Sequence, residues 1–135
     1  MNTSKLTFNV ISDERGRLVS LENNKNIPFA IERIYYLYDS NTEQDRGMHA
    51  HRKLKQLLIC MSGSCEIEID DASERRLYKL DSPSEGLFID GVIWREIKFL
   101  TEETVLVVLA DREYDEEDYI RDYEEFLKIK KNEIS

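Results

Sequence analysis

The stretch RGMHAHRKLKQLLICMSGS, residues 46–64, holds both histidines of this chain, His49 and His51. In a β-strand, residues two apart point to the same face of the sheet. The two imidazoles are therefore predicted to enter one cavity together or to meet solvent together. After the histidines the stretch becomes apolar and ends in a Ser-Gly-Ser turn, which is typical of a strand that leads into a hairpin.

The rest of the chain consists mainly of short β-rich runs separated by Gly, Pro, Asn, Asp and Ser. Strands are predicted over residues 6–10, 29–38, 56–61, 65–70, 75–80, 86–89, 94–99 and 104–110. Many short strands with turn signals about every 8–12 residues indicate a β-sandwich or a β-barrel. The sequence therefore predicts a single domain over 1–135 with an all-β body over about 5–111.

The last part of the chain changes its period. Four acidic residues at 115–118 precede apolar residues at helical spacing, and lysines follow. This order suits the helix dipole and predicts a short C-terminal α-helix over about 115–131. The acidic run is interpreted as the N-terminal turn of this helix rather than as a metal site.

Composition limits the class of partner. The chain has 135 residues, 41% of them hydrophobic, and a net charge of −9 without a long Lys/Arg cluster. Neither a nucleic-acid surface nor a membrane surface is predicted, no apolar stretch is long enough to cross a bilayer, and a small ligand is favoured. Cys60 and Cys65 flank a turn, and no secretory segment is recognised, so reduced, buried thiols and a cytoplasmic location are predicted.

Counting outward from the histidines gives Gly-x-His-x-His, four residues, Gln56, six residues and Gly63. This pattern resembles the first motif of the cupin barrels, in which a glutamate stands in the place of Gln56 and joins three histidines in holding a divalent metal. Residues 89–95 resemble the second motif, and the place of the third histidine falls at or beside Arg95. The resemblance implies a cupin barrel, also called a double-stranded β-helix or jelly roll. Because an amide is a weak ligand and a guanidinium has no lone pair to give, no metal is predicted.

Longer stretches resemble a particular cupin family, the nucleotide-sugar 3,4-ketoisomerases, from about residue 5 to residue 127. They are RIYYLY at 33–38, RGMHAHRKLKQLLI at 46–59, LDSP at 80–83, WRE at 94–96, VLAD at 108–111 and YDEEDYIRDYEEF at 114–126. Members convert dTDP-4-keto-6-deoxyglucose into a 3-keto-6-deoxyhexose without metal or cofactor, on the route to 3-amino-3,6-dideoxy sugars of bacterial surface glycans. The resemblance also implies a homodimer and allows exchange of the N-terminal strand, 5–10, between its subunits.

The implied reaction moves a ketone from C4 to C3 through an enediol or enediolate, which is proton transfer that an imidazole pair can perform. On the resemblance, His49 is assigned as the base at C3 and His51 as the proton shuttle, since their spacing alone does not rank them. Tyr35 is the candidate phenol that hydrogen-bonds the sugar oxygens or aids proton transfer. Strand alternation places it on the same face as Arg33.

Four polar side chains are candidates for substrate binding: Arg33, Arg46, Gln56 and Arg95. Arg33 and Arg46 are expected to clasp the diphosphate by bidentate hydrogen bonds. Gln56 is expected to bind a hydroxyl or to orient His51. Whether Arg95 or Trp94 points into the barrel stays open, because a slip of one residue in strand register reverses the faces.

Two alternatives remain at this level. The same histidine pair is compatible with a metal-dependent cupin enzyme, and the barrel is compatible with a module that binds nucleotide sugars without turnover. Within the ketoisomerase interpretation, the C4 configuration of the product, galacto or gluco, depends on the face at which the enediolate is protonated. That face and the identity of the nucleotide base stay open as well.

Overall fold

The computed structural model describes residues 2–134. Its strands are β1 (Thr3–Thr7), β2 (Ile11–Asp13), β3 (Gly16–Leu18), β4 (Arg33–Leu37), β5 (Arg46–His51), β6 (Gln56–Ser62), β7 (Cys65–Asp70), β8 (Arg75–Leu80), β9 (Glu85–Ile89), β10 (Trp94–Phe99), β11 (Val105–Ala110) and β12 (Tyr119–Ile120). A 3₁₀ turn, Glu116–Asp118, precedes β12, and one α-helix, α1 (Tyr123–Ile134), follows it. The predicted all-β body with a short C-terminal helix is confirmed.

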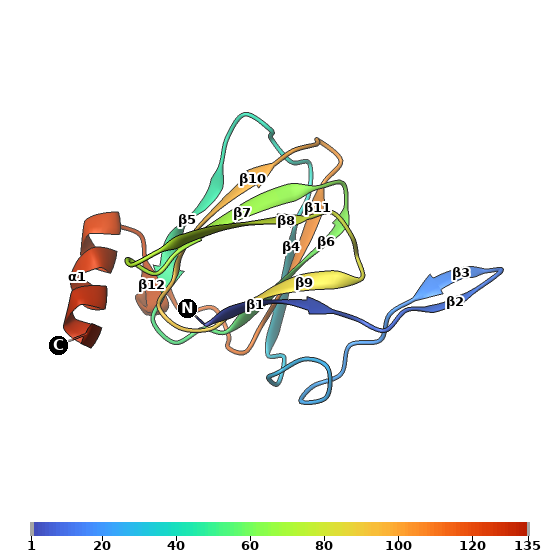
Figure 1. Cartoon of the computed structure of the whole chain (residues 1–135), viewed down its shortest axis with the longest axis horizontal. Coiled ribbons are helices and arrows are strands. Elements are labelled where there is room, and N and C mark those ends of the chain that lie inside the picture. The colour runs from blue at the N-terminus through green and yellow to red at the C-terminus, as the bar shows by residue number, and fades with distance from the viewer. Residues whose placement is uncertain (1, 135) are drawn as a thin grey trace.

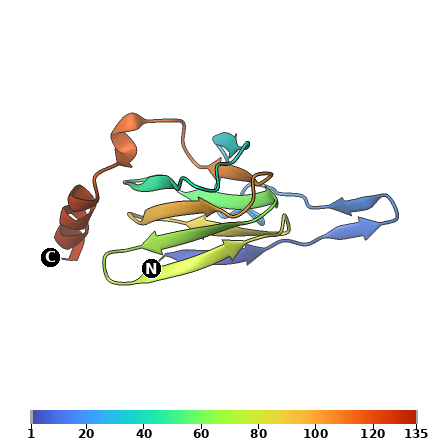
Figure 2. The ribbon, with the colours of Figure 1, turned by 90° about the horizontal axis from the view of Figure 1, so that it is seen from above.

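Two five-stranded antiparallel sheets form the body (Figure 1). The first has the order β1-β9-β6-β11-β4 and the second the order β12-β5-β10-β7-β8. Figure 2 shows that α1 and the small β2–β3 hairpin lie at opposite ends of the body. Among the described residues, no helix combines the length and the apolar character that crossing a bilayer requires.

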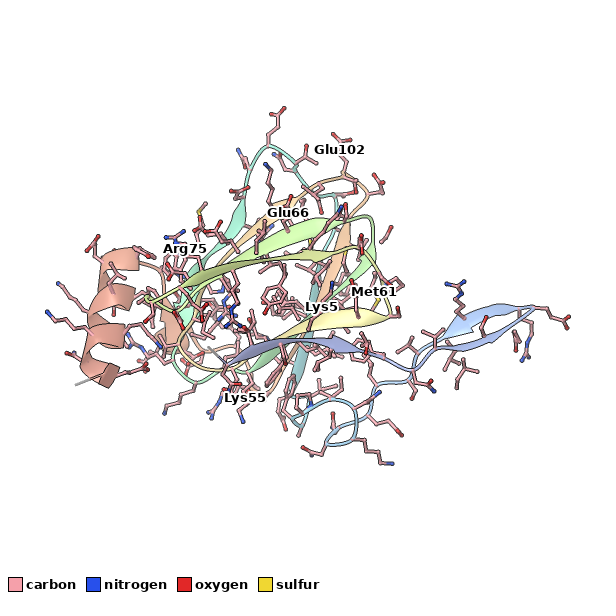
Figure 3. The ribbon with its side chains drawn as sticks, viewed as in Figure 1. Lys5, Lys55, Met61, Glu66, Arg75 and Glu102 are labelled. Atoms are coloured by element: carbon pink, nitrogen blue, oxygen red, sulfur yellow. The ribbon has the colours of Figure 1, made fainter. Side chains whose placement is uncertain are left out.

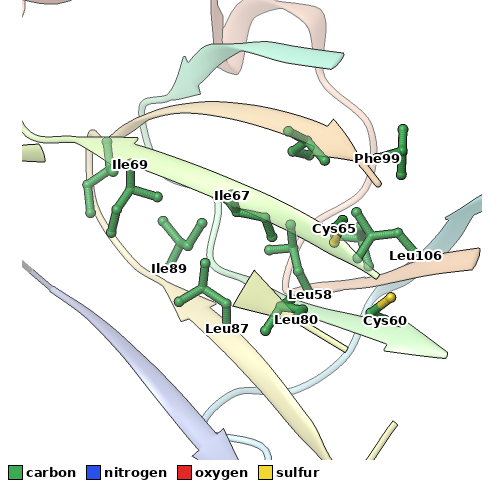
Figure 4. Packing of buried hydrophobic residues seen from close by; sticks show 13 residues of the cluster. Leu58, Cys60, Cys65, Ile67, Ile69, Leu80, Leu87, Ile89, Phe99 and Leu106 are labelled. Atoms are coloured by element: carbon green, nitrogen blue, oxygen red, sulfur yellow. The ribbon is translucent and has the colours of Figure 1, made fainter. Parts of the chain in front are cut away.

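The hydrophobic core lies between the two sheets (Figure 4). Alternate residues of β7, Cys65, Ile67 and Ile69, are fully buried there and face Leu87 and Ile89 of β9. Burying a branched aliphatic side chain of this size contributes about 1.5–3 kcal/mol relative to leaving it exposed. Charged side chains labelled in Figure 3, such as Lys55 and Glu102, point away from the body.

Two cysteines belong to this core. Cys60 and Cys65 are both buried in strands and both are free thiols. The sequence-based prediction for these two residues agrees with the structure.

The outer face of the second sheet is covered at one end by α1. Phe126 of the helix is fully buried and packs against Trp94, with ring centroids 5.8 Å apart. Ala50 of β5 and Ile120 of β12 complete this cluster and are fully buried too. Strands β5, β10 and β12 are therefore buried on both faces at this end, with the helix on one side and the barrel interior on the other.

The predicted C-terminal helix is wrong in its first half. Residues 116–118 form a 3₁₀ turn capped by the carboxylate of Asp115, and Tyr119 and Ile120 then pair with His51 and Ala50 of β5. Burial of Ile120 and the strand pairing outweigh the local helical pattern, so α1 begins only at Tyr123.

The N-terminal region also differs from the prediction. The first strand is Thr3–Thr7 rather than 6–10, and it pairs with β9 of the same chain. The β2–β3 hairpin was not predicted, because its short strands are exposed on all sides and carry no clear alternation. The run predicted at 29–38 is a strand only over Arg33–Leu37.

Candidate active site

A cavity of about 450 Å³ opens into the barrel between the two sheets. Its lining combines apolar side chains with the polar side chains of arginine, histidine, glutamine and tyrosine. Strands β4, β5, β6, β10 and β11 supply most of the lining, and Tyr114, Tyr119 and Arg121 come from the segment after β11. The volume lies within the range of small-molecule sites, about 300–1,000 Å³.

The two histidines come together on the inner face of β5, as their spacing predicts. Their rings meet edge to face with centroids 4.8 Å apart. His49 lines the cavity, whereas His51 is fully buried beside it and lies against the Tyr119 ring, 4.4 Å between centroids. The pair therefore has an outer member that faces the cavity and an inner member that is shielded from solvent.

A bulge-like irregularity in β5 directly precedes His49, whose side chain lines the cavity. The register between β5 and β10 shifts beside Arg95, and Gly47 and Met48 both adopt positive φ angles, 85° and 53°. A Cβ atom on Gly47 would lie 3.0 Å from the carbonyl oxygen of Arg95. Glycine is therefore required at this position by both its backbone conformation and its close approach to β10.

Each histidine has its Nδ1 atom engaged and its Nε2 atom free. Nδ1 of His49 lies 2.9 Å from the carbonyl oxygen of Gly47, which can only accept, so Nδ1 carries the proton. Nδ1 of His51 lies 2.9 Å from Oδ2 of Asp118. Both Nε2 atoms are buried and have no hydrogen-bond partner within residues 2–134. Each ring therefore keeps a free Nε2 lone pair, that of His49 in a ring that lines the cavity and that of His51 in the ring buried beside it.

Burial keeps both rings neutral. It lowers the pKa of His49 to about 4, and the positive charge of Arg95 adds to the effect. Burial and the same guanidinium lower the pKa of His51 to about 2. Both imidazoles are therefore unprotonated at neutral pH and ready to accept a proton.

Arg95 settles the register question that the sequence left open. Its side chain is buried inside the barrel, while Trp94 points outward against α1. The guanidinium donates to Oε1 of Gln56 and, at 2.9 Å, to the carbonyl oxygen of Ile93. No ion pair of Arg95 is found in the described part of the chain, and burial lowers its pKa to about 10. A charged but unpaired guanidinium thus lies at the inner wall of the cavity.

Gln56 connects Arg95 to Tyr35. Its Nε2 donates to the Tyr35 hydroxyl at 3.0 Å, so the hydroxyl keeps its own proton for another acceptor. Burial raises the pKa of Tyr35, and the nearby Tyr119 adds to the increase. As predicted, Arg33 and Tyr35 share one face of β4, and both line the cavity. Tyr36 lies on the opposite face of the strand and is exposed.

Arginines surround the cavity although the chain as a whole is acidic. Arg33 stacks over Tyr35 at 4.9 Å, and Arg46 is exposed at the start of β5. Arg121, which the sequence did not single out, stacks over Tyr119 at 4.3 Å and is paired with Glu116. With Arg95, these side chains make the cavity suited to an anionic ligand.

The segment after β11 supplies site residues that sequence reasoning missed. Tyr114, Tyr119 and Arg121 line the cavity, and Asp118 binds His51. The interpretation of 115–118 as the first turn of a helix is wrong for Asp118, because β12 pairs with β5 and carries this carboxylate to the histidine. The local signal for a role in the site was the presence of Tyr114, Tyr119 and Arg121 next to the acidic residues 115–118.

The donor set for a metal is incomplete. Gln56 and Arg95 occupy the two remaining cupin ligand positions, and they hydrogen-bond to each other. Within residues 2–134, no group of three or more His, Cys, Asp or Glu side chains is arranged to hold a metal ion.

Comparisons with known proteins cover nearly the whole chain. The model of the family described as "FdtA: WxcM-like, C-terminal" matches residues 1–131. The chain is 45% identical over 128 residues to a TDP-4-oxo-6-deoxy-α-D-glucose-3,4-oxoisomerase of Aneurinibacillus thermoaerophilus, covering 95% of this chain and 92% of that protein.

Solved structures give the same match. A 3,4-ketoisomerase from Helicobacter canadensis is 46% identical, with a TM-score of 0.95 over 97% of this chain and 98% of the other. The sugar 3,4-ketoisomerase QdtA from Thermoanaerobacterium thermosaccharolyticum, in complex with TDP, is 40% identical, with a TM-score of 0.95 over 99% and 98%. A histidine-to-asparagine variant of QdtA was solved with TDP-4-keto-6-deoxyglucose and has a TM-score of 0.94, covering 97% and 95%.

Proposed function

This chain belongs to the FdtA family, described as WxcM-like, C-terminal, and on that premise we propose that it is a sugar-nucleotide 3,4-ketoisomerase. The resemblance predicted from the sequence, and the cupin barrel that it implies, are thereby confirmed. The proposed substrate is dTDP-4-keto-6-deoxyglucose and the product a dTDP-3-keto-6-deoxyhexose. The observation that carries the proposal is the pair of neutral imidazoles with free Nε2 atoms, one lining a cavity surrounded by arginines and one buried directly beside it.

In the proposed reaction His49 removes the proton from C3 of the sugar, because its ring lines the cavity and is neutral at physiological pH. The electron pair left at C3 forms an enediolate with the C4 carbonyl. A proton then returns to C4, and the hydroxyl proton of O3 moves to O4. Protons only change places, so the isomerisation needs no oxidant, reductant or cofactor.

His51 is the proposed shuttle between the two oxygens. Its Nε2 atom is a buried acceptor without a partner in the described residues, and a sugar hydroxyl would satisfy it. Tyr35 can donate its hydroxyl proton because the oxygen already accepts from Gln56. Arg95 is proposed to stabilise the negative charge of the enediolate, since a positive charge is worth most in a site that excludes water.

The diphosphate is assigned to the outer arginines. Arg33 and Arg46 have no ion pair in the part of the chain that the structure describes, so their guanidinium groups are available for bidentate contacts with phosphate oxygens. Their place on the cavity wall supports the predicted role of both. Gln56 and Arg95 are deeper and are proposed to contact the sugar.

The homodimer and the cytoplasmic location belong to the proposal too. Large apolar side chains are exposed on β2, β3 and β4, among them Ile11, Leu18, Ile34 and Tyr36, and they support a partner surface. Pairing of β1 with β9 is compatible with an exchange in which the same pairing forms between two subunits. Light scattering on the purified protein measures the mass directly, and a monomer at micromolar concentration would contradict this part.

Incubation of the purified protein with dTDP-4-keto-6-deoxyglucose in D₂O tests the function. We expect deuterium to enter the sugar ring and a 3-keto product to form, both visible by NMR, which also gives the C4 configuration. Treatment with a chelator should leave the rate unchanged, and metal analysis should find no stoichiometric Fe, Mn or Zn. A folded sample without exchange would contradict the proposal, and loss of activity on chelation would favour the metal-dependent alternative.

The dependence of kcat/KM on pH should be flat from about pH 8 down to about pH 5. A base must be unprotonated, and the pKa of His49 is lowered to about 4, so activity is lost only as the pH falls through that value. The folded state itself becomes less stable at low pH. A histidine in the unfolded chain takes up a proton near pH 6.5, so the free energy of unfolding declines below that pH. Circular dichroism at each pH separates the two effects. A midpoint near 6.5 with the fold intact would show an ordinary, exposed histidine as the base.

A further inference from the structure

Asp118 lies where the 3₁₀ turn meets β12, and both of its carboxylate oxygens are engaged. Oδ2 accepts from Nδ1 of His51 at 2.9 Å, and Oδ1 accepts from the backbone N–H of Lys53 at 2.7 Å. The main-chain carbonyl of Asp118 also accepts from the N–H of Arg52 at 3.0 Å. The carboxylate is therefore fixed in position, with only 11% of its side chain exposed, directly behind the inner histidine.

The two histidines differ in what holds them. His49 donates to the neutral carbonyl of Gly47, whereas His51 donates to a carboxylate. A carboxylate stabilises a positive charge on the ring that it binds, and a neutral carbonyl does so much less. Of the two rings, His51 is therefore the one with a negatively charged acceptor at Nδ1.

We propose that Asp118 is a positioning residue of the site: it fixes His51 as the Nδ1–H tautomer, so that Nε2 faces the substrate as the acceptor, and it supports the imidazolium that forms when Nε2 takes up a proton. The inference rests on the proposed ketoisomerase function. It assigns to the chain a carboxylate–histidine pair formed across 67 residues of sequence. Asp118 acts only through His51 and does not line the cavity itself.

A purely structural role is the competing explanation, because Asp118 also ties the turn after β5 to the C-terminal segment. Asp111 provides a matched control. Its Oδ1 accepts from the backbone N–H of Lys55 at 2.8 Å, which ties the other end of the same turn, and it does not contact a histidine. Asp111→Asn and Asp118→Asn therefore make the same chemical change in two similar tethers, and only one of them touches the site.

Asp118→Asn is the informative substitution because it keeps the shape and the oxygen that accepts from Lys53. Its NH₂ group then faces Nδ1 of His51, so Nδ1 has to accept and the ring proton moves to Nε2. We expect kcat to fall about 10²–10⁴-fold, the range seen when a histidine base is held in the wrong tautomer, with KM within about threefold. Asp111→Asn is expected to keep kcat within about threefold of the wild-type value.

¹⁵N NMR of the imidazoles provides a readout that a structural role does not move. Wild-type His51 should show the Nδ1–H tautomer, Asp118→Asn should show the Nε2–H tautomer, and His49 should be the same in both. Wild-type His51 as the Nε2–H tautomer would overturn the inference even if the variant failed to fold. Equal losses of kcat in the two variants, with an unchanged tautomer, would overturn it as well. If the wild-type protein shows no turnover, the proposed function fails on that assay, while the tautomer shift alone decides whether Asp118 positions His51.

Discussion

His49→Asn is expected to lower kcat about 10²-fold or more while the affinity for the nucleotide sugar stays within a few-fold of the wild-type value. Asparagine occupies a similar volume and can still hydrogen-bond, but it cannot take a proton from carbon. His49 lines the cavity with a neutral ring and a free Nε2, so the substitution removes the proposed base and little else. Stopped-time NMR assays give kcat, and titration calorimetry gives the affinity.

Met48→Ala is a suitable control for this variant. Met48 is the neighbour of His49 in β5, and its side chain is exposed outside the cavity. We expect its kcat to stay within about twofold of wild type, as for most exposed positions away from a site. His49→Asn with near-normal turnover would exclude His49 as the base, and loss of affinity in place of turnover would make it a binding residue.

Comparison with His51→Asn ranks the two histidines, which the sequence cannot do. Removing the base at C3 should abolish deuterium exchange at that carbon. Removing the shuttle should slow formation of the 3-keto product while slow exchange at C3 continues, because His49 is still in place. The reverse pattern would exchange the two roles. The measurement needs only the substrate, D₂O and the two variants.

The parts of the site that follow strand alternation could be predicted from the sequence. His49 and His51 share a face because the irregularity of β5 lies at Gly47 and Met48, before the pair rather than inside it. Arg33 lines the cavity because β4 is regular and its outer face stays exposed. A period of two is enough where only one face of a strand is buried.

The other parts depend on contacts between distant segments. The sequence could not show whether Trp94 or Arg95 points into the barrel. At this place β10 is buried on both faces, by α1 outside and by the cavity wall inside, so the hydrophobicity of the two residues does not distinguish the faces. Asp118 was assigned to a helix because its neighbours in sequence are acidic. Its function in the structure depends on pairing of Tyr119 with His51, which no local pattern encodes. A short strand of two residues carries too little periodicity to be recognised before its partner is known.

Arg95→Met is expected to lower kcat about 10²–10³-fold, the loss typical when one group that stabilises an oxyanion is removed. The fold should tolerate the change. Burial lowers the pKa of Arg95 from its ordinary value to about 10, and since one pKa unit corresponds to about 1.4 kcal/mol, the buried charge costs the folded state on the order of 3 kcal/mol. Methionine removes that cost but leaves the acceptors on Gln56 and Ile93 without a donor, at about 1–3 kcal/mol.

The two contributions to stability therefore nearly cancel, and the free energy of unfolding in urea should change by less than about 2 kcal/mol. Phe126→Ala serves as a reference for a loss of core packing. Removing this fully buried ring should lower the free energy of unfolding by about 3–5 kcal/mol. An Arg95→Met protein that is unstable but fully active would make Arg95 a structural residue. A stable protein with little turnover would mean that the chain keeps an unpaired guanidinium in its interior for the negative charge that develops on the substrate.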